Sequence, residues 1–155
     1  MLIRKRFVAL CAILMLLFCI VGKTVNANAV TQERIEFEDG SYCITTIIIN
    51  STGTIRLFAV DSVNNKSASK YANYYDPRGK LLYTTRVTAT FSYDGKTAKA
   101  LSAKSGYSIS DSSWSYVSGS ADISGNSATA TCTFKSSSGT RSLSATISCS
   151  PTGSI

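Results

Sequence analysis

The sequence predicts an all-β fold, an antiparallel β-sandwich of about seven to nine strands. Apolar and polar residues alternate with a period of two almost everywhere beyond residue 30, as half-buried strands require. Short motifs rich in Gly, Asp and Pro separate these segments, and no segment has a helical period. This combination is typical of an immunoglobulin-like sandwich, which is the topology that we expect.

The first strands are bounded by tight turns. Asp39-Gly40 predicts a hairpin between strands over residues 34–38 and 42–49. Ser51-Thr52-Gly53 then leads into a strand over residues 55–60. The turn at residues 76–79, with the sequence DPRG, joins a strand over residues 70–75 to a long strand over residues 81–93, which Asp94-Gly95 ends.

The second half of the chain is rich in Ser and Thr and is expected to continue as β-hairpins. Four glycines, Gly106, Gly119, Gly125 and Gly139, are interpreted as punctuation between strands. Large side chains recur at strand-like positions, which argues against a disordered tail: Trp114, Tyr116, Ile123, Phe134, Leu143 and Ile147. We expect Trp114 to fill the space between the two sheets.

Residues 1–29 have the pattern of a cleavable signal peptide. Arg4, Lys5 and Arg6 precede an apolar run over residues 7–22, and Ala27-Asn28-Ala29 supplies small residues before Val30. The alternative, a membrane anchor, normally needs about 20 apolar residues followed by stop-transfer charges. We therefore expect a secreted protein, outside the cell or at the cell envelope, with one domain over residues 30–155 and no membrane association after cleavage.

Removal of the leader changes the charge of the chain. Four basic residues leave with it and no acidic residue does, so the formal net charge falls from +7 to +3. The remaining charges are spread singly and form no run that would follow phosphates or anionic lipid. The sequence therefore predicts no nucleic-acid partner.

Three cysteines remain after cleavage, Cys43, Cys132 and Cys149, so at most one intramolecular disulfide can form. The alternation around Cys132 and Cys149 places both in the interior. A hairpin closed near Ser137 sets Cys149 opposite about residue 127, which disfavours a bridge to Cys132. Cys43 can meet either one across the sandwich, or all three can be buried free thiols.

The catalytic motifs in the chain are weak. It contains no His, which excludes Ser-His-Asp and Cys-His catalysis and His-based zinc sites. The S-x-x-K spacing of Ser67 and Lys70 falls in an expected loop, whereas penicillin-recognising enzymes need it at the start of a helix. Glu36 and Glu38 share a face near the mature N-terminus, which suits a solvated edge better than a glycosidase cleft. We expect no enzymatic activity, no metal site and no cofactor.

Tyrosines form the one cluster that suits ligand binding: Tyr71, Tyr74 and Tyr75, with Tyr83 on the following strand. A tyrosine ring offers an apolar face and a polar tip, which suit sugar rings and peptide backbones. Tyr74 and Tyr75 must point to opposite faces of a regular strand. The alternative is that these rings only stabilise the hairpin through cross-strand contacts.

Three stretches resemble a group of small, uncharacterised secreted proteins of Gram-positive (Firmicute) bacteria. They are FEDGSYCITT at residues 37–46, YYDPRGKLLY at residues 74–83 and TFSYDG at residues 90–95. The resemblance covers nearly the whole mature chain. It implies a bacterial extracellular β-domain, and it transfers no catalytic residue and no ligand.

Two functional classes follow from these observations. The first is a secreted, non-catalytic module that binds a cell-wall polymer, a glycan or a protein through an aromatic sheet face. The alternative is a secreted antagonistic effector, such as a toxin or a bacteriocin-like protein, that acts on other cells. The sequence leaves the oligomeric state open.

Overall fold

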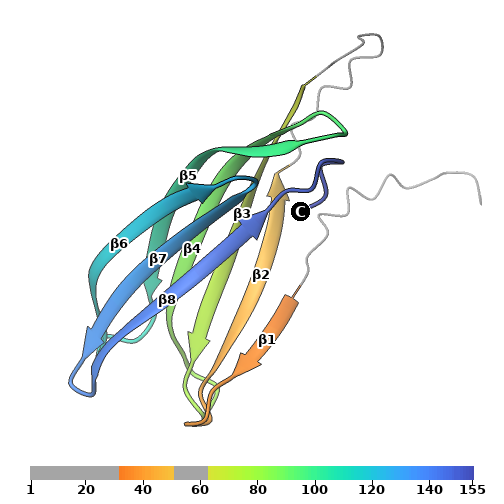
Figure 1. Ribbon diagram of the computed structural model, residues 1–155. Coiled ribbons are helices and arrows are strands. Elements are labelled where there is room, and N and C mark those ends of the chain that lie inside the picture. The colour runs from red at the N-terminus through yellow and green to blue at the C-terminus, as the bar shows by residue number, and fades with distance from the viewer. Residues whose placement is uncertain (1–31, 51–62) are drawn as a thin grey trace, which may run out of the picture.

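The structure is a computed structural model that describes residues 32–50 and 63–155 (Figure 1). The expected leader over residues 1–29 and the expected strand over residues 55–60 lie outside the described residues. A helix with the length and apolar character of a membrane span is absent from the two described ranges.

The predicted antiparallel sandwich is confirmed. The described residues form eight strands in two antiparallel sheets, the first of five strands and the second of three. The strands are β1 (Gln32–Glu36), β2 (Tyr42–Asn50), β3 (Asn64–Tyr75), β4 (Leu81–Tyr93), β5 (Ala98–Ile109), β6 (Ser115–Ser124), β7 (Ser127–Ser136) and β8 (Gly139–Ser148).

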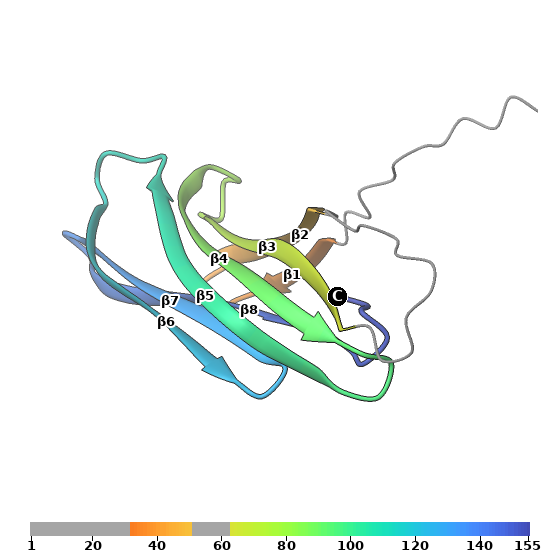
Figure 2. The same cartoon turned by 90° about the horizontal axis from the view of Figure 1, so that it is seen from above.

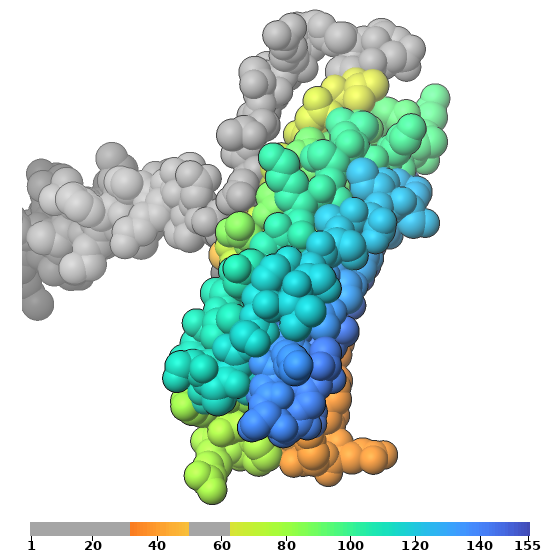
Figure 3. All heavy atoms as spheres, turned by 90° about the vertical axis from the view of Figure 1, so that its left-hand side faces the viewer, coloured from red at the N-terminus to blue at the C-terminus, as the bar shows by residue number. Residues whose placement is uncertain are grey.

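Each sheet is a meander, in which every strand pairs with its neighbour in sequence. The order is β1-β2-β3-β4-β5 in the first sheet and β6-β7-β8 in the second. Figures 1 and 2 show the second sheet as a layer across β3, β4 and β5, and Figure 3 shows the side of the molecule on which β5 meets the second sheet. Immunoglobulin domains have Greek-key connections instead, so the immunoglobulin-like part of the prediction is not confirmed.

The core lies between the layers and follows the period of two. On β4, alternate side chains from Tyr83 to Phe91 point inward and are buried, as the sequence predicts. The facing strands β7 and β8 contribute small and medium side chains together with Phe134, which is fully buried. The inward residues of these two strands are Ala128, Ala130, Cys132, Phe134, Leu143, Ala145 and Ile147.

The predicted turns at residues 39–40, 76–79 and 94–95 are confirmed, because each separates two paired strands and holds a glycine with positive φ. Gly125 and Gly139 also lie at strand ends. The interpretation of Gly106 and Gly119 as punctuation is wrong. Both lie inside strands, where a Cβ atom would approach a neighbouring side chain to within 3 Å. These two glycines leave space for a neighbouring side chain, and they form no turn.

The prediction of a loop before Lys70 is also wrong. Strand β3 begins at Asn64, so Ser67 and Lys70 both lie within it. Residues three apart on a strand point to opposite faces. Ser67 pairs with Thr90 and exchanges a hydrogen bond of 3.0 Å with its hydroxyl, whereas Lys70 is on the other face. The S-x-x-K spacing therefore does not bring the two side chains together.

Cys43, Cys132 and Cys149 are buried and free in the structure. Cys132 lies opposite Leu143, and the backbone N–H of Cys149 donates to the Asn126 carbonyl at 3.0 Å. The register thus separates these two cysteines along the hairpin, as the sequence predicts. Burial raises the pKa of all three thiols.

The C-terminal segment, residues 149–155, closes one end of the sandwich. The N–H of Gly95 donates to the Pro151 carbonyl at 2.9 Å, and the Lys66 ammonium donates to the carbonyl of Gly153. Gly153 itself is buried against the ring of Tyr93. The segment is therefore part of the folded domain.

Candidate functional site

The structure divides the three candidate tyrosines between two faces of β3. Tyr74 points inward and keeps only 5% of its surface exposed. Tyr71 and Tyr75 point outward and are half-buried, where they lie opposite Arg86 and Tyr42 respectively. Alternation along the strand separates Tyr74 from the other two. The three rings cannot act as one binding surface.

Tyr74 belongs to the core and to a polar network at one end of the sandwich. Its ring stacks on Tyr83 with centroids 4.9 Å apart, and its hydroxyl lies 2.7 Å from the Ser41 Oγ. The Arg141 guanidinium donates to the same hydroxyl and forms an ion pair with Asp39 at 2.9 Å. Tyr74 therefore joins the two sheets instead of facing a ligand on the sheet surface.

The outer face of the five-stranded sheet carries a row of stacked side chains across β1, β2 and β3. The guanidinium carbon of Arg34 lies 3.8 Å from the centroid of the Tyr42 ring. The Tyr42 ring in turn stacks on Tyr75, with centroids 4.9 Å apart and planes 9° apart. Glu36 forms an ion pair with Arg34 at 2.8 Å. This row places two stacked rings and a guanidinium on one half of the face.

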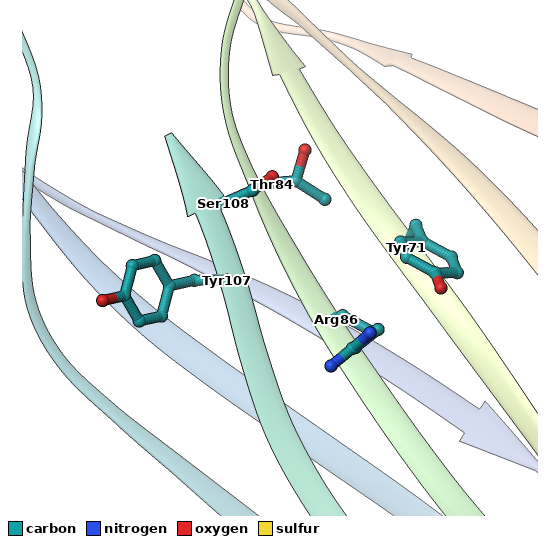
Figure 4. A pocket seen from close by; sticks show the side chains of 5 residues that line it. All are labelled: Tyr71, Thr84, Arg86, Tyr107 and Ser108. Atoms are coloured by element: carbon teal, nitrogen blue, oxygen red, sulfur yellow. The ribbon is translucent and has the colours of Figure 1, made fainter. Parts of the chain in front are cut away.

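A shallow hollow of about 120 Å³ lies on the same face, over β3, β4 and β5. Figure 4 shows Tyr71, Thr84, Arg86 and Ser108 around it. The Thr84 hydroxyl donates to the Asn73 side-chain oxygen at 2.8 Å, which fixes that side of the hollow. Tyr107 also lines the hollow, but Figure 4 shows its ring directed away from Tyr71 and Arg86.

The position of Arg86 depends on the glycine across from it. Gly106 on β5 is the partner of Arg86 in the sheet register. A Cβ atom on Gly106 would lie 2.9 Å from the Arg86 Nη2 and 3.0 Å from its Nε. The guanidinium therefore lies close against the β5 backbone, in space that only glycine leaves free.

We define the outer tyrosine face as Tyr42, Tyr71, Tyr75, Thr84, Arg86 and Ser108.

Trp114 lies at the end of the sandwich and is only half-buried, so the prediction that it fills the space between the sheets is wrong. It tilts against Tyr83 at a centroid distance of 4.8 Å. It also lines a second hollow, of about 150 Å³, with Asp39 and Arg141. The reason is that Trp114 follows the turn at Asp111, in the connection between the sheets, and not a strand interior.

Two ionic contacts near this end involve aspartates. Hydrogen bonds from Ser41 and from Arg141 lower the pKa of Asp39 to about 2. Lys80, 2.6 Å from the Asp111 carboxylate, likewise holds the pKa of Asp111 at about 2. Both carboxylates are therefore ionised at neutral pH. The Asp39 pair joins the β1–β2 turn to β8, and the Asp111 pair joins the β3–β4 turn to the connection between β5 and β6.

The described residues bring no metal-ligand set together. No group of three or more Asp, Glu or Cys side chains in residues 32–50 and 63–155 is placed to hold a metal ion. The outer tyrosine face instead combines rings, hydroxyl groups and one guanidinium, which are groups that bind by stacking and hydrogen bonding.

Sequence reasoning identified Tyr71 and Tyr75 but missed Tyr42, Thr84, Arg86 and Gly106. The alternation in residues 81–93 placed Thr84 and Arg86 on the polar face. Counting back from the pair Tyr75–Leu81 at the turn would set Thr85 beside Tyr71, but a register shift between Tyr74 and Tyr75 brings Arg86 to that position. Nothing in the sequence indicates this shift. No protein family, curated protein or solved structure matches this chain.

Proposed function

We propose that this chain is a secreted, non-catalytic module that binds a glycan polymer of the cell envelope through the outer tyrosine face. The observation that carries the proposal is the hollow between Tyr71 and Arg86, on the same face of the sheet as the stacked rings of Tyr42 and Tyr75. Rings beside hydroxyl and guanidinium donors suit a sugar, whose faces are apolar and whose edges carry hydroxyl groups.

The shape of the face supports a polymer as the ligand. Enclosed pockets for small molecules have volumes of about 300–1,000 Å³, whereas this hollow measures about 120 Å³. The hollow accommodates one chemical group of a ligand at a time and buries little of the surface of that group. A polymer that passes along the sheet adds contacts with the neighbouring rings, so its affinity builds up over several units.

The charges on this face support binding rather than hydrolysis. Glycoside hydrolases place two carboxylic acids about 5–10 Å apart across the bond that they cleave. Among the described strands β1 to β5, Glu36 supplies the one carboxylate at an outward position, and it is paired with Arg34. The hydroxyl groups around the hollow have no histidine to activate them, because the chain has none.

A retention assay on insoluble polysaccharide tests the proposal. The double variant Tyr71→Ala/Tyr75→Ala should lose retention while keeping its fold, since both rings lie on the outer face. Val117→Ala is the control, because Val117 is 53% exposed and lies on β6 in the second sheet, away from the outer tyrosine face. Equal retention of the double variant and the parent would refute the proposal, and growth inhibition of whole cells would favour the effector alternative.

The secreted state has a separate test. If residues 1–29 are a signal peptide, protein recovered from culture medium should begin at Val30, and intact mass spectrometry measures this directly. A full-length product that stays with the cells would contradict secretion. This result does not depend on which ligand the tyrosine face binds.

A further inference from the structure

Arg86 has no acidic partner in the part of the chain that the structure describes. The ion pairs there are Arg34–Glu36, Lys80–Asp111 and Arg141–Asp39. Arg86 is exposed, and its guanidinium takes part in none of the described hydrogen bonds. All of its N–H donors therefore remain available. Lys104, also exposed, lies opposite Thr88, the next outward residue of β4.

The guanidinium lies close to one stretch of backbone. Gly106 leaves space for it against β5, and Tyr71 and Ser108 line the same hollow. The Ser108 and Tyr71 hydroxyl groups make no described hydrogen bond, so each is free to donate. Several donors and one positive charge thus line a volume of about 120 Å³.

We propose that this hollow binds an anionic substituent, a phosphate or a carboxylate, carried by the glycan polymer. A guanidinium presents its donors in a planar fork that matches two oxygens of either group. The hydroxyl groups of Tyr71 and Ser108 can donate hydrogen bonds to the remaining oxygens of the anionic group. The inference rests on the proposed function, and it narrows the ligand from glycans in general to acidic ones.

Three immobilised glycans separate the possibilities: phosphomannan, polygalacturonate and neutral dextran. The parent should be retained on at least one acidic polymer and not on dextran, and retention should weaken as salt rises, because exposed charges are screened beyond about 10 Å at 0.1 M salt. The acidic polymer that retains the protein identifies phosphate or carboxylate as the group.

Two variants test the place of binding. Arg86→Gln should weaken binding to the acidic polymer by about tenfold or more, the effect of losing a charge-assisted hydrogen bond. Gly106→Ala keeps every charge but puts a Cβ where the guanidinium lies, so it should weaken binding as well. The backbone of Gly106 is not in the positive-φ region, so an alanine is tolerated at this position. Thermal melting checks that both variants fold.

Arg78→Gln is the matched control. Arg78 is exposed in the turn between β3 and β4, so this variant loses the same charge away from the hollow. Equal losses for Arg78→Gln and Arg86→Gln would overturn the site and leave only a net-charge effect. Equal retention on dextran and on the acidic polymers would overturn the anionic ligand while the glycan-binding function stands. Retention on no glycan, acidic, neutral or insoluble, would overturn both.

Discussion

Tyr83 touches three aromatic rings and links the two sheets. It stacks on Tyr74 at 4.9 Å and on Phe134 at 4.1 Å, and Trp114 tilts against it at 4.8 Å. Tyr83 and Phe134 are fully buried, while Trp114 covers the outer end of the group. The contribution of each ring to stability therefore decreases from the centre of this group outward.

Alanine substitutions at the two ends of this group should differ. Phe134→Ala should lower the free energy of unfolding by about 3–5 kcal/mol, the usual cost of a cavity where a buried ring was. Trp114→Ala should cost less, because the indole keeps solvent contact. Chemical denaturation measures both. An equal or larger loss for Trp114→Ala would place the indole in the core.

The two tyrosines on either side of β3 should respond differently to loss of the hydroxyl. Tyr74→Phe removes a hydroxyl that contacts Ser41 and Arg141, so it should cost about 1–2 kcal/mol of unfolding free energy. Tyr71→Phe removes a hydroxyl without a described partner and should leave stability unchanged. Unchanged stability of Tyr74→Phe would show that the network around Tyr74 contributes nothing.

At the scale of elements, the sequence located strands best where large side chains alternate. The expected strand over residues 81–93 coincides with β4, because Tyr83, Val87 and Phe91 mark its inner face. The start of β3 was missed, because its inward position there is Ala68, which is fully buried although it is small. A small residue in a narrow gap leaves no periodic signal in hydrophobicity.

The same limit explains the candidate site. The period of two separates Tyr74 from Tyr71 and Tyr75, but it does not say which side is the core. That choice depends on Phe134, which packs on Tyr83 from a strand about fifty residues further along the chain. The prediction for Gly106 was wrong for a related reason. The sequence alone does not distinguish a glycine that leaves space for a side chain, here that of Arg86, from a glycine that forms a turn.

The C-terminal segment provides a prediction at this scale. Gly153 has a φ of 82°, and a Cβ there would lie 2.5 Å from the Tyr93 ring. Gly95 has a similar φ of 86° with no atom within 4 Å of its Cβ position. Gly95→Ala should cost about 1–2 kcal/mol from the backbone alone, and Gly153→Ala about 2–4 kcal/mol. Equal melting temperatures for the two variants would show that the segment does not pack on Tyr93.

At the scale of the whole molecule, two aspartates predict the acid limit of stability. The folded pKa of Asp39 and of Asp111 is about 2, below the ordinary value of 3.8. A lowered folded pKa stabilises the fold above about pH 4, and this stabilisation is lost as the pH falls from about 4 to about 2. The melting temperature should fall across that window.

The double variant Asp39→Asn/Asp111→Asn tests this assignment. Its melting temperature should depend less on pH between about 2 and 4 than that of the parent. Asp122→Asn is the control, because Asp122 on β6 forms no ion pair among the described residues. If the control flattens the profile as much as the double variant does, the two ion pairs are not the cause.

The buried thiols predict a global property. Because Cys43, Cys132 and Cys149 are buried and burial raises each pKa, a thiol reagent at pH 8 should react slowly with the folded chain. After unfolding in denaturant without reductant, all three should react at once. Detection of a single reactive thiol would instead indicate one disulfide among the three.

In the described residues the chain crosses from one sheet to the other once, between β5 and β6. This connection is the place where the chain can be divided. All ladder pairing in the described residues falls either between β1 and β5 or between β6 and β8. A break in residues 110–114 therefore cuts no sheet and leaves two complementary fragments, one for each layer. Such fragments have only the interlayer contacts, above all Tyr83 against Phe134, with which to find each other. Their reassembly would measure how much of the fold is carried by the contacts between the sheets.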